Sequence, residues 1–124
     1  MKRDIADCRA LVTGASGGIG RAVALELARQ GARLVVVARR EERLRALAAE
    51  VAALGREIEC VAGDVTDRAT RLACLGRAEE RFGGLDALVN NAGIGAIGPF
   101  AEASPERLRQ VFEVNFFALA EMTR

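Results

Sequence analysis

The 124-residue sequence contains no histidine, no tyrosine and no tryptophan. Without histidine, a Ser-His-Asp triad and an HExxH zinc site are excluded, and without tyrosine no tyrosine acid can act within these residues. Cysteine is scarce: Cys8, Cys60 and Cys74 lie far apart and form no CxxC pair. This spacing argues against a disulfide framework and against a zinc site. We therefore expect reduced thiols, a cytoplasmic location and no bound metal.

A charge excess and a long apolar run are missing as well. The 18 basic and 17 acidic residues are interspersed and give a net charge of +1, whereas a nucleic-acid or anionic-membrane surface needs a concentrated basic patch. No apolar stretch reaches the ~20 residues of a membrane span. We predict no nucleic-acid partner and no membrane partner. The hydrophobic content of 51% predicts a packed core in a single domain.

Short apolar runs alternate with longer amphipathic stretches along the whole chain. Aliphatic runs of this kind predict buried strands at 9–13, 34–37, 58–62 and 86–90. Apolar residues at helical spacing predict helices at 18–30, 41–54 and 67–82. Ser104 as N-cap, Pro105 at the first helical position and Glu106 in the first turn predict a last helix, which we expect to run to the end of the chain.

This alternation predicts the fold class α/β, with a doubly wound parallel sheet. Right-handed crossovers leave few arrangements, of which the strand order 3-2-1-4 is the most favoured. Neither a linker nor a repeat interrupts the pattern, so we expect one domain over residues 1–124. The fourth strand would then be an aliphatic edge, which favours association with another chain.

A glycine-rich segment, TGASGGIG at residues 13–20, lies where the first strand passes into the first helix. Glycines let the backbone approach a pyrophosphate closely, and the start of the helix offers unpaired N–H groups to it. A simple tight turn is the alternative, which the position between strand and helix disfavours. Because no G-K-[ST] follows, the segment is not a P-loop. It also differs from G-x-G-x-x-G, since Val23 stands where the third glycine would fall.

A second motif, NNAG at residues 90–93, follows the fourth strand. A generic Asn/Gly turn is its alternative interpretation. With both motifs at this spacing, the sequence resembles the short-chain dehydrogenase/reductase family over its whole length, which corresponds to about the first half of a family member. The resemblance implies a Rossmann-type, NAD(P)(H)-dependent oxidoreductase of the alcohol dehydrogenase or carbonyl reductase type. Its substrate would be a small-molecule alcohol or ketone, whose identity the sequence does not indicate.

The resemblance also implies roles for individual residues. Asp64 would accept a hydrogen bond from the adenine amino group, although it could equally form a turn before the third helix. Asn115 would be catalytic and hold a water in a proton relay, its alternative being a surface position on the last helix. The expected cofactor-binding residues are Gly14, Ser16, Gly17, Gly18, Ile19, Gly20, Arg39, Arg40, Asp64, Val65, Asn91, Ala92 and Gly93.

The choice of cofactor depends on the end of the second strand. Ala38 stands where NAD-binding relatives carry an acid for the ribose 2′-hydroxyl, and Arg39 and Arg40 follow it. Guanidinium groups suit a 2′-phosphate, so we predict NADP(H) over NAD(H). Solvated arginines at the start of a helix are the alternative. The family's other mark of NADP, a basic residue within the glycine turn, is missing at Gly17.

The chemistry of the family uses a serine, and a tyrosine followed by a lysine four residues later. This sequence has no tyrosine, and its single lysine is Lys2. We therefore expect the chain alone to be inactive and to be truncated at its C-terminal end. The alternative is a non-catalytic dinucleotide-binding module, whether split, degenerate or engineered. Because the last helix carries more apolar residues than one face can bury, and relatives use it in subunit contacts, we also expect a homo-oligomer.

Overall fold

The centre of the molecule is a parallel four-stranded sheet, seen here in a computed structural model that describes residues 4–124. The strands are β1 (Arg9–Thr13), β2 (Arg33–Ala38), β3 (Ile58–Ala62) and β4 (Ala87–Val89). Their order is β3-β2-β1-β4 and all three pairings are parallel. The predicted α/β class and strand order are confirmed. Residues 1–3 of the predicted domain lie outside the described part.

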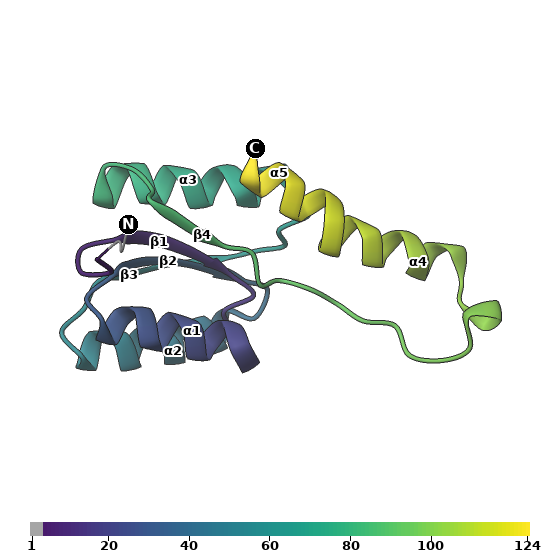
Figure 1. Cartoon of the computed structure of the whole chain (residues 1–124), viewed down its shortest axis with the longest axis horizontal. Helices are drawn as coiled ribbons and strands as arrows, with labels where there is room; N and C mark the ends of the chain where they lie inside the picture. Colours follow the sequence, from purple (N-terminus) through teal and green to yellow (C-terminus); the bar gives the residue numbers. More distant parts are fainter. Residues whose placement is uncertain (1–3) are drawn as a thin grey trace.

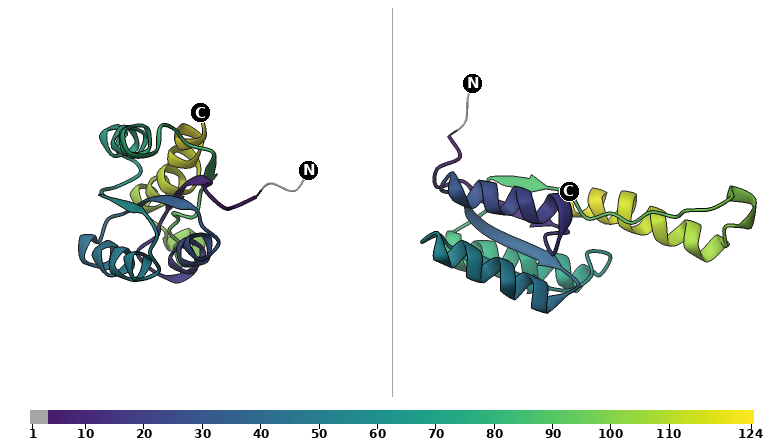
Figure 2. Two further views of the ribbon diagram at one scale, coloured as in Figure 1. Left: turned by 90° about the vertical axis from the view of Figure 1, so that its left-hand side faces the viewer. Right: turned by 90° about the horizontal axis from the view of Figure 1, so that it is seen from below.

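Helices cover both faces of this sheet (Figure 1). One face is covered by α1 (Gly18–Arg29) and α2 (Glu41–Ala53), and the other by α3 (Arg68–Phe82). Each of these helices agrees with its predicted range to within one residue, because a glycine or a polar residue stands at or close to each end. The chain after β4 reaches out beyond the sheet and returns along α4 (Pro105–Phe112), as Figure 2 shows from two further sides.

The core has one layer on each side of β2, whose central residues are completely buried. Leu34 and Val36 pack toward α1 and α2, while Val35 and Val37 pack toward α3. This alternation explains why β2 is aliphatic at every position from Leu34 to Val37. Cys74 of α3 belongs to the second layer, and burial raises the pKa of its thiol to about 11, so the thiol is protonated at neutral pH.

The last helical segment corrects one prediction, because it is not a continuous α-helix. Ser104 is its N-cap as expected, with Oγ accepting a hydrogen bond from the Arg107 N–H at 3.1 Å. After α4, however, η2 (Glu113–Ala118) is π-helical, and only then does α5 (Leu119–Thr123) follow. A π-helix accommodates an extra residue within a helix. Hydrophobic periodicity does not reveal such an insertion in so apolar a stretch.

This segment leaves large apolar side chains in contact with solvent. Phe112, Phe116 and Phe117 have exposed fractions of 53%, 58% and 51%. The expectation of more apolar surface than one face can bury is thus met, while the homo-oligomer itself stays a prediction. A short 3-10 helix, η1 (Phe100–Glu102), precedes α4. Within residues 4–124 no helix is long and apolar enough to cross a membrane.

Candidate functional site

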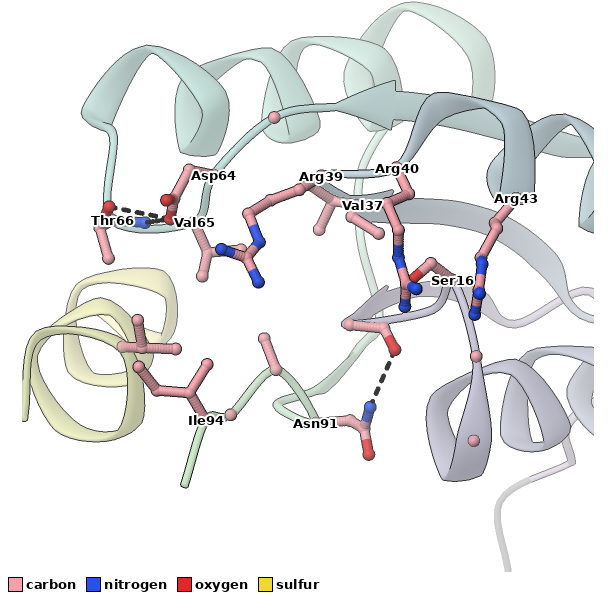
Figure 3. Close-up of a pocket in the computed structure, with 18 of the residues that line it drawn as sticks. Ser16, Val37, Arg39, Arg40, Arg43, Asp64, Val65, Thr66, Asn91 and Ile94 are labelled. Atoms are coloured by element: carbon pink, nitrogen blue, oxygen red, sulfur yellow. Dashed lines mark hydrogen bonds between the residues drawn. The ribbon is translucent and has the colours of Figure 1, made fainter. Parts of the chain in front are cut away.

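A cleft of about 1120 Å³ lies at the carboxyl ends of the strands (Figure 3). The residues that follow β1, β2, β3 and β4 all contribute to its lining. Open parallel sheets bind ligands at this edge. The predicted residues that line it are Gly14, Ser16, Gly17, Gly18, Arg39, Arg40, Asp64, Val65, Asn91, Ala92 and Gly93. Ile19, Gly20 and Asn115 were also predicted as site residues but are not part of the lining.

The glycine turn after β1 has the geometry of an anion-binding loop. Gly14 and Gly18 adopt left-handed φ angles of +66° and +55°, which favour glycine. The N-cap of α1 is Gly17, and no side chain caps the first turn of this helix. The N–H groups at the start of α1 are therefore free of side-chain partners and suited to a phosphate. Ile19 is 76% exposed and does not line the cleft, so its contact with the cofactor stays a prediction.

Gly20 is needed for packing rather than for the lining of the cleft. A Cβ on Gly20 would lie 2.3 Å from the carbonyl oxygen of Gly14 and 2.3 Å from Nδ2 of Asn91. The start of α1 can approach the end of β1 this closely only because Gly20 has no side chain. The last glycine of the turn thus fixes where the turn lies relative to the loop after β4.

Thr13 and Asn91 join the glycine turn to the loop after β4. The buried Thr13 Oγ1 accepts hydrogen bonds from the N–H groups of Asn91 at 3.0 Å and Ala92 at 2.9 Å. The side-chain Nδ2 of Asn91 donates in return to the carbonyl oxygens of Thr13 at 3.2 Å and Gly14 at 3.1 Å. The two motifs found in the sequence are therefore one hydrogen-bonded unit.

Three arginine side chains enter the cleft from the end of β2 and the start of α2. Arg39 points into the cleft on the side of Val65, while Arg40 and Arg43 point toward the glycine turn (Figure 3). Arg40 Nη2 donates to Ser16 Oγ at 3.3 Å. Among the described residues, no carboxylate lies within ion-pair distance of any of these three guanidinium groups. They give this end of the cleft a positive charge that an anion can neutralise.

Asp64 has the turn role that was the alternative to its predicted cofactor contact. Its Oδ1 accepts hydrogen bonds from the N–H of Thr66 at 2.9 Å and from Thr66 Oγ1 at 2.8 Å. Asp64 also lines the cleft, beside Val65 (Figure 3). The observed turn fixes the carboxylate at the edge of the cleft, and its contact with adenine stays a prediction.

Asn115 lies in η2 and binds the backbone of Ile94 with both ends of its side-chain amide. Its Oδ1 accepts from the Ile94 N–H at 2.8 Å, and its Nδ2 donates to the Ile94 carbonyl oxygen at 2.7 Å. Ile94 lines the cleft, whereas Asn115 does not. The side chain therefore positions the loop after β4, and its role in a proton relay stays a prediction.

Sequence reasoning missed several residues of the cleft. Arg43 stands three positions after Arg40, a spacing that brings two side chains to the same side of a helix and could have indicated it. Ile94 and the α4 and η2 residues have no comparable signal, because only the folded chain brings them to the cleft. The additional lining residues are Val37, Ala38, Arg43, Gly63, Thr66, Ile94, Gln110, Glu113 and Val114.

Comparison with known proteins identifies the family. Residues 9–124 match the short chain dehydrogenase family. The chain belongs to this family. The resemblance inferred from the glycine turn and the NNAG loop is thereby confirmed, and in this member of the family these are the two segments that Thr13 and Asn91 hold together.

Individual relatives agree with this assignment. The chain is 38% identical over 112 residues to L-2,3-butanediol dehydrogenase of Corynebacterium glutamicum, an alignment that covers 89% of the chain and 43% of that protein. A short-chain dehydrogenase/reductase from Mycobacterium marinum superposes with a TM-score of 0.91 at 32% identity, over 97% of this chain and 49% of that one. L-sorbose reductase of Gluconobacter frateurii, solved with NADPH and L-sorbose, superposes with a TM-score of 0.90 at 34% identity. This superposition covers 98% of the present chain and 48% of the reductase. The chain spans less than half the length of each of them.

Replacing Asn115 with alanine tests the link between η2 and the cleft in this member of the family. The variant loses both hydrogen bonds to Ile94, each worth about 1 kcal/mol, so we expect amide hydrogen exchange at Ile94 to rise about five-fold or more. Glu121→Ala removes an exposed ion pair with Arg124 on the same helical segment and serves as the control. Equal exchange rates at Ile94 in Asn115→Ala and in the unchanged protein would contradict the positioning role.

Proposed function

We propose that this chain forms the dinucleotide-binding part of an oxidoreductase that prefers NADP(H) and interconverts an alcohol and a carbonyl compound. The observation that carries the proposal is the pairing of an uncapped helix start with guanidinium groups that have no carboxylate partner among the described residues, in one cleft. Both features suit phosphate groups, and a dinucleotide presents them at two places.

The residues of the cleft fit such a cofactor from end to end. The turn at Gly14–Gly18 would hold the pyrophosphate, and Arg40, which points toward this turn, would hold a ribose 2′-phosphate, with Arg39 on the side of Val65. Asp64 would lie at the adenine, and the loop at 91–93 would lie along the nicotinamide ribose. When bound, the nicotinamide group supplies hydride transfer. The contribution of this chain is to bind and orient the cofactor, through the turn and the loop that Thr13 holds together.

The proposed substrate class, a small-molecule alcohol or ketone, is supported by what relatives act on. One relative is a dehydrogenase of a diol, and a structural neighbour is a reductase solved with a ketose and NADPH. The chain contains neither tyrosine nor histidine. We therefore propose that the group that exchanges a proton with the substrate oxygen lies in the part of the protein that corresponds to the second half of these relatives.

The test is a nucleotide titration of the protein as its intact gene encodes it. One charge-assisted contact to the 2′-phosphate is worth about 1.5–3 kcal/mol, so we expect NADPH to bind about 10- to 150-fold more tightly than NADH. Binding is followed by the fluorescence of the reduced nicotinamide. Absence of saturable binding of either nucleotide would contradict the proposed function, whereas equal affinities would contradict only the preference for NADP(H).

A further inference from the structure

Arg43 lies in the first turn of α2, and its guanidinium group reaches the glycine turn on the opposite side of the cleft. Its Nη1 is 3.4 Å from the point where a Cβ on Gly17 would lie. Figure 3 shows the side chain extending from α2 toward the turn, parallel to that of Arg40. Arg40 Nη2 is 4.0 Å from the same point, so two guanidinium groups converge on Gly17.

This convergence is unfavourable unless an anion is present, because two like charges lie near one point. Several other arginines of the chain are paired with acids: Arg45 binds Glu41 at 2.9 Å, and Arg81 binds Glu59 at 2.7 Å. Within the described residues, neither Arg40 nor Arg43 has such a partner, and the acidic residues at the start of α2, Glu41 and Glu42, do not line the cleft. The two guanidinium groups of Arg40 and Arg43 are thus placed to bind a negative charge that a ligand supplies.

The glycine turn itself supplies no cation, since residues 13–20 contain neither lysine nor arginine. We propose that Arg43, acting from α2, provides the cation beside Gly17 and is a specificity-determining residue for a nucleotide with a ribose 2′-phosphate. The inference rests on the proposed NADP(H) function and adds a residue and a geometry to it. Arg39 points toward Val65, on the other side of the cleft, so only Arg40 and Arg43 of these three arginines lie beside Gly17 (Figure 3).

The physical reason for specificity is the charge of the ligand group. A 2′-phosphate offers several acceptor oxygens and a negative charge to the planar guanidinium fork. A 2′-hydroxyl offers a single neutral oxygen, which gains far less from the same contact. Arg43 should therefore contribute to the binding of 2′-phosphorylated nucleotides and contribute little to the binding of their unphosphorylated counterparts.

The test compares 2′,5′-ADP with 5′-AMP, which differ only in the 2′-phosphate, on the protein encoded by the intact gene. In Arg43→Gln we expect the affinity for 2′,5′-ADP to fall at least about 10-fold, the size of one charge-assisted hydrogen bond. The affinity for 5′-AMP should stay within two-fold, which also shows that the variant is folded. The matched control is Arg45→Gln, which removes the same charge from α2 and leaves Glu41 without this partner. It should keep the ratio of the two affinities.

A second variant tests whether the position of the cation beside Gly17 determines the affinity for the 2′-phosphate. Gly17 has extended backbone, with φ −171° and ψ 179°, so it accepts a side chain without strain. Only the flexible ends of Arg43 and Arg40 lie within 4 Å of its Cβ position. Adding Gly17→Arg to Arg43→Gln moves the cation from α2 into the turn. We expect this double variant to regain most of the lost affinity for 2′,5′-ADP.

Three outcomes would overturn the inference: an unchanged ratio in Arg43→Gln, an equal loss in Arg45→Gln, or no recovery in the double variant. Each leaves the proposed function standing, provided that the unchanged protein prefers 2′,5′-ADP. If the unchanged protein binds both nucleotides equally, the NADP(H) preference fails, and the role of Arg43 fails with it.

Discussion

Replacing Gly20 with alanine will abolish tight nucleotide binding and will lower the free energy of unfolding by about 3 kcal/mol or more. The added Cβ would lie 2.3 Å from the Gly14 carbonyl oxygen and 2.3 Å from Nδ2 of Asn91. The first of these atoms is backbone, so the clash is relieved only if α1 moves away from the end of β1. That movement separates the helix start from the glycine turn, and the proposed phosphate site would be lost with it. Urea denaturation and a nucleotide titration measure the two effects.

Gly76→Ala is the matched control, because Gly76 also lies within a helix. A Cβ there meets no atom within 4 Å, and alanine is favoured over glycine in a helix interior by about 1 kcal/mol. We expect this variant to be slightly more stable than the unchanged protein and to bind nucleotide equally well. If Gly20→Ala also kept its stability, the close approach of α1 to β1 would not be the reason for glycine at position 20.

Much of this fold is predictable from local patterns, since each pattern reflects a local physical requirement. The aliphatic run at 34–37 predicts a strand buried on both faces, and β2 is that strand. Ser104 and Pro105 predict a helix start at the residue where α4 begins. The strand order follows because right-handed crossovers leave few alternatives. These predictions use only neighbouring residues and a general rule of topology.

The site was predictable only where its residues follow the ends of strands. Residues 39–40 and 91–93 were found in this way, because every parallel strand ends at the same edge of the sheet. Arg43 was missed because it lies inside a helix, where an exposed arginine is ordinary. The π-helix at Glu113–Ala118 was missed because apolar residues surround the extra residue on both sides. Ile19 was expected at the cofactor from its motif; its side chain is 76% exposed, and its contact with the cofactor stays a prediction.

The hydrogen bonds between Thr13 and the loop after β4 are the feature of the site that no local sequence pattern indicates. The two segments are far apart in sequence, and the pairing of β1 with β4 brings their ends together. Two motifs that look independent in the sequence are therefore joined in part by one hydroxyl group, beside the bonds that Asn91 Nδ2 donates. A change of the Thr13 side chain should act on the cleft through the loop at 91–93, without altering any of the residues proposed to bind phosphate.

Thr13→Val tests this dependence, since valine has nearly the shape of threonine without its hydroxyl. Thr13 is 3% exposed, so water does not replace the lost acceptor for the Ala92 N–H. A buried N–H without a partner costs about 1–3 kcal/mol, and we expect the free energy of unfolding to fall by that amount. With the loop at 91–93 released, nucleotide affinity should fall about 10-fold or more. Denaturation in urea and nucleotide titration report the two losses separately.

Thr13→Ser separates the hydroxyl from the methyl group. Serine keeps the acceptor for the Asn91 and Ala92 N–H groups, and its lost methyl group costs about 1 kcal/mol of packing. We therefore expect Thr13→Ser to lose some stability and to retain its affinity for nucleotide. If serine weakened binding as much as valine does, packing of the methyl group would hold the loop in place. If neither substitution changed binding, the glycine turn would form the phosphate site without the loop after β4.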